Sequence, residues 1–313
     1  MKLQQLRYIV EVARRGMNVS EAAEALYTSQ PGVSKQIKLL EDELGVMIFE
    51  RSGKRFTGVT EPGRSIIESA ERILREAENL KRLGRDYSGG DTGTLIVAAT
   101  HTQARYALPP AVKDFVTMHP KVQLTLHQGT PAQIADWVEK GDADIGIATE
   151  SLESHPGLVT LPVRQWSHCV IAPAGHPVLH SQPLSLAELA RWPLITYDSA
   201  FTGRSGINRA FQRQGLEPQV VLTALDADVI KTYVTLGLGL GIIAALAFDK
   251  ERDAGLEALE AGHLFESNTT RLALRRGVFL RRFEYDFITL FAPHLDRRAV
   301  ERVLQGGGDA YQL

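Results

Sequence analysis

Cysteine is nearly absent from this chain, which has one among its 313 residues. A single thiol, Cys169, cannot form a disulfide within the chain, and its place in the apolar run 168–172, without a flanking cation, predicts a buried structural group. Long hydrophobic runs are absent as well, because the longest, 236–247, is interrupted by three glycines and is too short to cross a bilayer. These absences exclude a disulfide-stabilised scaffold and a membrane-spanning protein.

Catalytic motifs are also missing. No CxxC or HExxH spacing occurs, no Ser-His-Asp or Cys-His arrangement is evident, and the glycine-rich stretch 237–241 lacks the lysine of a phosphate loop. His101 is the best candidate for a general base, but no nucleophile can be named beside it, and we interpret it as a wall residue. We therefore expect neither an enzyme nor a protein with a metal or a prosthetic cofactor.

No export signal is visible at the amino end, where residues 1–15 have the pattern of a charged amphipathic helix. We expect a cytoplasmic protein. The formal net charge is only -2, and residues 1–58 hold nine Lys or Arg against seven Asp or Glu, a local charge of +2. If this segment binds nucleic acid, it does so through a few placed cations and through paired copies rather than a diffuse positive field.

Residues 18–55 carry the pattern of two short helices followed by a basic hairpin. The second helix has an apolar stripe at helical spacing, formed by Val33, Ile37, Leu40 and Leu44. Thr28 or Ser29 can cap this helix, and Pro31 is tolerated in its first turn, so the helix begins near Gln30. The order of elements predicts a winged helix-turn-helix, whose second helix reads base edges in the major groove.

The residues expected to contact DNA lie on the outward side of this helix and on the hairpin. They are Ser29, Gln30, Pro31, Ser34, Lys35, Lys38, Arg51 and Lys54. The alternative is an ordinary three-helix corner whose lysines form a solvated face.

Apolar residues at alternating spacings of four and three continue after residue 61, at Ile66, Ala70, Ile73, Ala77 and Leu80. Such a heptad stripe predicts a helix that associates with a second copy of the chain. The alternative is a helix that packs on its own domain. Gly89, Gly90 and Asp91 end it with a flexible joint.

Beyond this joint, short strands alternate with helical patterns. The predicted strands are 94–99, 122–127, 143–148, 168–172, 194–198 and 220–223. This alternation predicts mostly parallel α/β sheets, in which ligands bind at the carboxyl ends of strands.

Hydroxyl and amide side chains follow three of these strands, at Thr100, Thr102 and Gln103, at Thr149, and at Thr202. Donors at the start of a helix suit an anion, and this favours a site for a sulfate or a carboxylate. Taken alone, Thr100 or Thr102 can equally be a helix cap.

The first 58 residues resemble the DNA-binding domain of LysR-type transcriptional regulators. The matching positions are Leu3, Leu6, Arg7, Tyr8, Val12, Ala13, Ser29, Gln30, Pro31, Ser34, Ile37, Leu40, Glu41, Leu44, Gly45, Phe49 and Arg51. The resemblance implies a sequence-specific regulator of double-stranded promoter DNA that works as a dimer or as a tetramer of two dimers, with RNA polymerase as a candidate partner.

The sequences ATHTQARYALP, IATE, FTGRS and DADVIKTYVTLGLG resemble the effector domain of the LysR-type branch that regulates cysteine biosynthesis and sulfate assimilation. The resemblance implies a cleft for sulfate, thiosulfate, N-acetylserine or O-acetylserine. Its motif positions are Thr100, Thr102, Gln103, Thr149, Trp166 and Thr202. The roles of Arg105, Arg204 and Lys231 stay open.

The expected architecture is an all-α winged helix-turn-helix over 1–59, a long linker helix over 60–88 and an α/β effector domain over 89–313. The effector domain is expected to resemble a periplasmic binding protein, with subdomain I at about 91–163 and 269–300 and subdomain II at about 164–268.

The expected function is regulation, mainly activation, of cysteine and sulfate assimilation genes. One alternative is a LysR-type regulator of organosulfur (alkanesulfonate) use. The alternative from another class is an anion-binding module or an enzyme that uses the cleft, and it leaves the first 85 residues unexplained.

Overall fold

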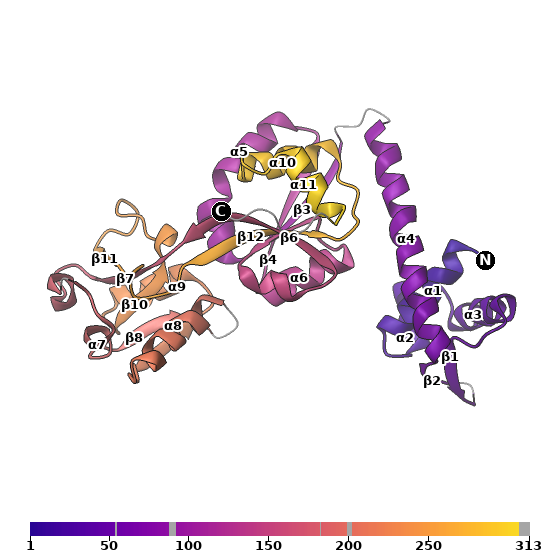
Figure 1. Cartoon of the computed structure of the whole chain (residues 1–313), viewed down its shortest axis with the longest axis horizontal. Helices are drawn as coiled ribbons and strands as arrows, with labels where there is room; N and C mark the ends of the chain where they lie inside the picture. The colour runs from indigo at the N-terminus through magenta and orange to yellow at the C-terminus, as the bar shows by residue number, and fades with distance from the viewer. Residues whose placement is uncertain (54, 88–91, 182, 199–201, 307–313) are drawn as a thin grey trace. The chain divides into compact units, whose positions relative to one another are not determined.

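The computed structural model describes residues 1–53, 55–87, 92–181, 183–198 and 202–306, with the backbone alone at 85–87, 150–151 and 202–203. Lys54 and the side chain of Thr202 therefore lie outside the described parts. The chain divides into two compact units, Met1–Ser88 and Gly89–Leu313 (Figure 1).

The first unit is a winged helix-turn-helix followed by a long helix, as the sequence predicted. Its elements are α1 (Leu3–Arg14), α2 (Val19–Ala25), α3 (Gln30–Leu44), the antiparallel hairpin of β1 (Phe49–Ser52) and β2 (Arg55–Val59), and α4 (Glu61–Tyr87). The Ser29 hydroxyl accepts a hydrogen bond from the Gly32 amide and Pro31 lies in the first turn of α3, so the predicted start at Gln30 is confirmed.

Three of the four residues in the predicted stripe of α3 are fully buried, but Leu44 is 40% exposed. The helix ends at this residue because Gly45 adopts the left-handed conformation, with a φ of 72°. The prediction that Leu44 belongs to the buried stripe was therefore wrong.

Glu41 ties the hairpin to α3. Its side chain is 2% exposed, one carboxylate oxygen accepts hydrogen bonds from the amides of Ile48 (2.9 Å) and Phe49 (3.2 Å), and the other pairs with Arg51. The Phe49 and Phe56 rings stack at 4.8 Å. A buried carboxylate with this many donors holds the hairpin in one position relative to α3.

The apolar stripe of α4 divides along the helix. Ala70 is buried, and Ile66 packs against the core of the first unit. Ile73 and Leu80, by contrast, are 40% and 69% exposed. The alternative interpretation, in which the helix packs on its own domain, is therefore correct for the part of the stripe at Ile66 and Ala70. The exposed part, at Ile73 and Leu80, is available for contact with a second copy of the chain.

The second unit contains two five-stranded sheets. The first has the order β4-β3-β5-β12-β6 and consists of β3 (Gly93–Ala99), β4 (Val122–Gln128), β5 (Ile145–Ala148), β6 (Leu158–Trp166) and β12 (Asn268–Arg275). The second has the order β11-β7-β10-β8-β9 and consists of β7 (His168–Pro173), β8 (Leu194–Tyr197), β9 (Val220–Ala224), β10 (Leu240–Ala244) and β11 (Leu256–Glu260).

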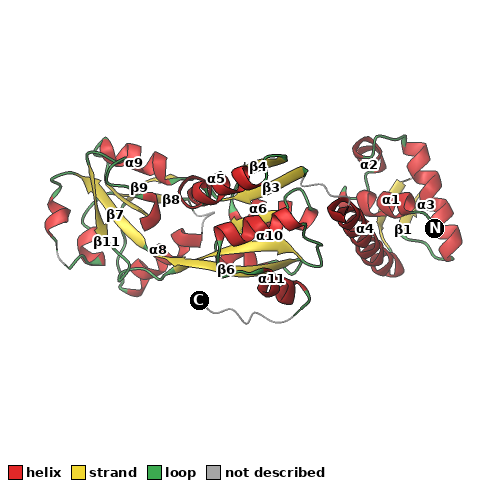
Figure 2. Ribbon diagram, turned by 90° about the horizontal axis from the view of Figure 1, so that it is seen from above, coloured by secondary structure: helices red, strands yellow, loops and turns green. Residues whose placement is uncertain are grey.

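Helices cover both faces of each sheet. Those of the first sheet are α5 (Pro109–Met118), α6 (Pro131–Lys140), α10 (Arg282–Phe291) and α11 (Arg297–Leu304), with the short turns η1 (Gln103–Ala107) and η2 (Glu150–Ser154). Those of the second are α7 (Leu186–Leu189), α8 (Thr202–Arg213) and α9 (Ala227–Thr235), with η3 (Pro177–His180) and η4 (Ala245–Ala247). Apolar clusters place α5 and α10 opposite α6, and Figure 2 shows α8 and α9 on opposite sides of the second sheet.

The prediction of mostly parallel sheets holds for the direction of the strands but not for every neighbouring pair. In each sheet four strands run in one direction and one runs against them, β12 in the first sheet and β7 in the second, so half of the neighbouring pairs are antiparallel. The reason is that the chain crosses between the sheets twice, from β6 to β7 through Ser167 and from β11 to β12 through residues 261–267. These crossing strands include three elements that the sequence patterns did not predict, β6, β11 and β12.

Cys169 lies on β7 and is 4% exposed, and burial raises the pKa of its thiol to about 12. The prediction of a buried structural thiol is confirmed, because a thiol that stays protonated is a poor nucleophile. Within the described ranges, none of the helices combines the length and the apolar composition that crossing a bilayer requires.

We predict that Glu41→Ala lowers the free energy of unfolding of the first unit by about 3–5 kcal/mol, because it removes one partner of a buried ion pair and leaves buried amides unsatisfied. Glu43→Ala is the matched control, since Glu43 is on the same helix and its side chain is 51% exposed. That variant should lose at most about 1 kcal/mol. Hydrogen exchange of the α3 amides in the full chain measures both values, and equal losses would contradict the anchoring role.

Candidate functional site

Three of the residues predicted to contact DNA share the exposed side of α3. Burial of Val33 and Ile37 turns Gln30, Lys35 and Lys38 to the exposed side of α3. Gln30 donates a weak hydrogen bond of 3.4 Å from its side-chain nitrogen to Ser34 Oγ. This side of α3 carries both amide and cationic groups, the two kinds that read purines in the major groove.

The Arg51 side chain is held by contacts within the first unit, which the sequence did not indicate. Its guanidinium pairs with the buried Glu41 carboxylate and lies 5.0 Å from the centre of the Phe56 ring. Arg51 therefore helps to hold the hairpin, and its remaining donors face outward, with the side chain 31% exposed.

The residues predicted to bind the effector come from the ends of four strands. Thr100 follows β3 and Thr149 follows β5, and these parallel strands are neighbours, with Ala99 paired to Ile147. The Thr100 amide donates to the Ile147 carbonyl at 3.2 Å. Because the carboxyl ends of adjacent parallel strands share one edge of the sheet, Thr100 and Thr149 lie side by side.

Gln103 and Trp166 meet over β12. The Gln103 side-chain nitrogen donates to Thr270 Oγ1 at 2.9 Å, and Trp166 is paired with Asn268, two residues earlier on the same strand. Residues two apart on a strand point to the same face, so Gln103 and Trp166 face the same small region.

Thr102 connects the two subdomains. Its side chain is hydrogen-bonded to the Tyr197 hydroxyl at the end of β8, which also accepts a hydrogen bond from the Ala244 amide at 3.2 Å. Burial raises the pKa of Tyr197, so the hydroxyl stays protonated. Thr202 begins α8, the helix after β8. Thr100, Thr102, Gln103, Thr149 and Trp166 are thus brought to one junction between the sheets, whereas the side chain of Thr202 is outside the described set.

Buried polar atoms that have no hydrogen-bond partner gather at the same junction. Ten such atoms occur in the described ranges, and six belong to this region: Gln103 Oε1, Trp166 Nε1, Thr196 Oγ1, Arg204 Nη1 and both ring nitrogens of His168. Folded proteins leave few buried polar atoms unpaired, and a cluster of them calls for a ligand or ordered water. The cluster marks the junction as the candidate effector site.

His168 and Thr196 were missed by the sequence analysis. Both side chains are 1% exposed, and the His168 ring lies 5.2 Å from the Trp166 ring. Burial lowers the pKa of His168 to about 4, so near pH 7 the ring is neutral, with one donor and one acceptor nitrogen. The only signal in the sequence is a polar residue at the first position of an otherwise apolar strand.

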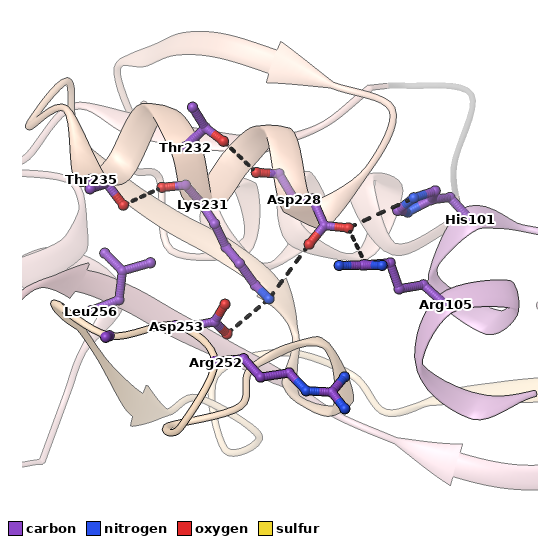
Figure 3. Close-up of a pocket in the computed structure, with 10 residues that line it drawn as sticks. His101, Arg105, Asp228, Lys231, Thr232, Thr235, Arg252, Asp253 and Leu256 are labelled. Atoms are coloured by element: carbon purple, nitrogen blue, oxygen red, sulfur yellow. Dashed lines mark hydrogen bonds and ion pairs between the residues drawn. The ribbon is translucent and has the colours of Figure 1, made fainter. Parts of the chain in front are cut away.

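A separate pocket of about 500 Å³ lies beside η1 and α9 (Figure 3). Arg105 Nε pairs with Asp228 at 2.9 Å, and Lys231 Nζ pairs with Asp253 at 2.8 Å. The sequence left open whether Arg105 and Lys231 bind the anion. In the structure, each of these two side chains pairs with a carboxylate. His101 lines this pocket, with Nε2 3.8 Å from Asp228.

His101, Asp226 and Asp228 bring potential metal-ligand atoms within 4.8 Å of one another. Asp226 caps α9 through the Val229 amide, and Asp228 already bonds with Arg105 and Tyr106. A metal ion would have to displace these partners, so the residues do not fit a metal centre.

Comparison with known proteins agrees with both halves of the chain. Residues 3–64 match the family model "Bacterial regulatory helix-turn-helix protein, lysR family", and residues 88–296 match "LysR substrate binding domain". The chain belongs to the LysR family of transcriptional regulators. The predicted family is therefore confirmed, and so are the class of DNA-binding regulator and the prediction that the chain is not an enzyme.

Two curated relatives from Burkholderia cenocepacia are each 54% identical to this LysR-family chain. "HTH-type transcriptional regulator SsuR" aligns over 305 residues, with 97% of this chain and 99% of the relative covered, and "HTH-type transcriptional regulator CysB" covers 100% of both. The solved cofactor-binding domain of the Cbl transcriptional regulator is 44% identical, with a TM-score of 0.66, and covers 69% of this chain and 95% of that one. The chain is thus a LysR-type regulator of the CysB, Cbl and SsuR type.

We predict an acid-dependent loss of stability from His168. The unfolded chain binds a proton at this ring near pH 6.5, whereas the folded chain binds it only near pH 4, so stability falls as the pH drops between these values. Between pH 7 and pH 5 the loss should be about 2 kcal/mol. His168→Gln should lack this part of the pH dependence, and His180→Gln, at an exposed position, should keep it. Urea unfolding at the two pH values measures the difference, and identical pH dependence in all three proteins would refute the assignment.

Proposed function

We propose that this LysR-type regulator binds promoter DNA of genes for cysteine biosynthesis and sulfate assimilation, mainly as an activator, and responds to a small anion at the junction of its two effector subdomains. The observation that carries the proposal is the cluster of unpaired buried polar atoms among Gln103, Trp166, Thr196, Arg204 and His168. The 54% identity to a CysB regulator over the whole chain supports the choice of genes.

The donors and acceptors of the junction indicate the chemistry of the effector. Trp166 Nε1 and Arg204 Nη1 are donors without a partner, and they suit the oxygens of sulfate, thiosulfate or a carboxylate. Gln103 Oε1 and one nitrogen of neutral His168 are acceptors, and they suit a ligand that also carries an N–H or O–H group. N-acetylserine and O-acetylserine combine an anionic group with such a donor, whereas sulfate uses the donors alone.

We propose that the regulator acts in the cytoplasm as a dimer or a tetramer of two dimers, with the exposed Ile73 and Leu80 of α4 in the contact between copies. Two copies present two α3 helices to adjacent half-sites, which compensates for the mild charge of each one. Effector binding alters the arrangement of the copies and the bend of the DNA, and RNA polymerase responds to this change. A coupling of this kind is typically about 1 to 3 kcal/mol.

We predict that Gln30→Ala or Lys35→Ala weakens specific DNA binding by about 1–3 kcal/mol if the residue reads a base. Effector affinity should not change, because both residues are in the first unit. Lys140→Ala is the control, since Lys140 is an exposed cation on α6 that pairs with Asp136. The measurement is a binding titration with promoter fragments that the protein itself selects from random DNA. Unchanged affinity in both α3 variants would argue against α3 as the reading helix.

We predict that calorimetric titration detects binding of at least one of sulfate, thiosulfate, N-acetylserine and O-acetylserine, and that Thr100→Ala and Thr149→Ala each weaken it by about 0.5–1.5 kcal/mol per lost hydrogen bond. Thr117→Ala is the control, because the Thr117 hydroxyl donates to the Lys113 carbonyl within its own exposed helix turn. Binding of none of the four would refute the sulfur assignment and leave the regulator class intact.

Regulation of organosulfur use is the second candidate function. It is favoured by one observation: SsuR is as similar to this chain as CysB is, at 54% identity. Chromatin immunoprecipitation from the host decides between them, since the first proposal expects occupancy at sulfate assimilation promoters and the second at alkanesulfonate promoters.

A further inference from the structure

We infer that Tyr106, Asp228, Lys231 and Asp253 form a clamp between the two effector subdomains, and that this clamp positions the turn that carries Thr102 and Gln103. The inference rests on the proposed function, because it makes Tyr106 a positioning residue for the same effector site. The residues of the clamp do not themselves belong to the cluster of unpaired atoms.

The clamp joins η1 of the first subdomain to α9 and the loop before β11 of the second. The Tyr106 hydroxyl donates to Asp228 Oδ1 at 2.6 Å and accepts a hydrogen bond from Lys231 Nζ at 3.0 Å. Lys231 Nζ also lies 2.8 Å from Asp253 and 4.9 Å from the centre of the Tyr106 ring. Arg105 adds an outer ion pair to Asp228 at 2.9 Å, which Figure 3 shows beside the Lys231 pair.

The ion pair of Lys231 and Asp253 is the part of the clamp that is shielded from solvent. These two side chains are 9% and 12% exposed, whereas those of Asp228 and Arg105 are 38% and 57% exposed. Burial disfavours the Lys231 ammonium, but its hydrogen bonds to Asp253 and Tyr106 outweigh this, and the pKa of Lys231 is raised. The ammonium therefore stays charged, and a shielded charged pair resists screening by salt better than a surface pair does.

The turn η1 connects the clamp to the effector site. It is a single π-helical turn over Gln103–Ala107, in which the Leu108 amide bonds to the Gln103 carbonyl at 2.9 Å. One side of the turn bonds to β12 through Gln103, and the other bonds to α9 through Tyr106. A turn this short moves as one piece, so its attachment at Tyr106 also sets the position of Thr102 and Gln103.

The test compares Tyr106→Phe with Tyr285→Phe. Tyr285 lies on α10, and the Arg297 guanidinium, which pairs with Glu301, is 4.8 Å from the centre of its ring, so both substitutions remove a tyrosine hydroxyl beside a charged pair. We expect Tyr106→Phe to raise the calorimetric Kd for sulfate and N-acetylserine about tenfold, within the range of coupled sites. The DNA-binding response at saturating N-acetylserine should be retained, because positioning changes affinity and not the final state. Tyr285→Phe should match the wild type.

Hydrogen exchange supplies the second readout. Without ligand, the amides of residues 103–107 should exchange faster in Tyr106→Phe than in Tyr285→Phe, and saturating N-acetylserine should remove the difference. Asp228→Asn should also raise the Kd and speed the exchange at residues 103–107. In the double variant with Tyr106→Phe, the loss of effector affinity should be smaller than the sum of the two single losses, because both substitutions act on one contact.

Three results would overturn the inference. One is equal Kd values in the wild type and Tyr106→Phe, and another is an equal rise in both Tyr variants, which would indicate a general loss of structure. The third is unchanged exchange at residues 103–107. If the wild type binds neither probe, the proposed function fails, and the exchange comparison without ligand alone decides whether the clamp holds η1.

Discussion

The effector unit depends on one constraint, which is that the chain passes twice between its two sheets. The shorter crossing has one residue, Ser167, between the end of β6 at Trp166 and the start of β7 at His168. The two sheets are thus tied together where Trp166 pairs with Asn268 and His168 pairs with Ala244. A link this short fixes the distance between the sheets, and the carboxyl ends of β3, β5 and β8 meet beside it.

This junction gathers polar side chains in a place that excludes water. Gln103, Trp166, His168 and Thr196 leave buried atoms unpaired there, and an unpaired buried group costs about 1–3 kcal/mol. A ligand that supplies the missing partners recovers this energy and gains affinity from it. Because this link is short, contacts between the subdomains affect the position of the residues at the junction. The Tyr106 hydroxyl, which joins η1 to α9, therefore influences a site that it does not contact.

Local sequence rules predicted the parts of the chain that local forces determine. The cap at Ser29, the proline at residue 31 and the stripe from Val33 to Leu40 gave α3 its correct start, because capping and helical periodicity act within a few residues. The prediction that Leu44 is buried was wrong because Gly45 turns the chain and ends the helix at Leu44. The strands β6 and β12 were not predicted because they are stabilised by pairing with each other, and they lie about 110 residues apart in the sequence.

The sequence by itself determined the LysR family, the exposed side of α3 and the positions of Thr100, Thr102, Gln103 and Thr149 after strand ends, since these depend on motifs and on the direction of the chain. Only the tertiary structure decided that His168 and Thr196 belong to the same junction, that Arg105 and Lys231 face carboxylates, and that part of the α4 stripe packs inward at Ala70. The reason is physical: the partner of a side chain is set by packing between elements that are distant in sequence, and no local pattern encodes that distance.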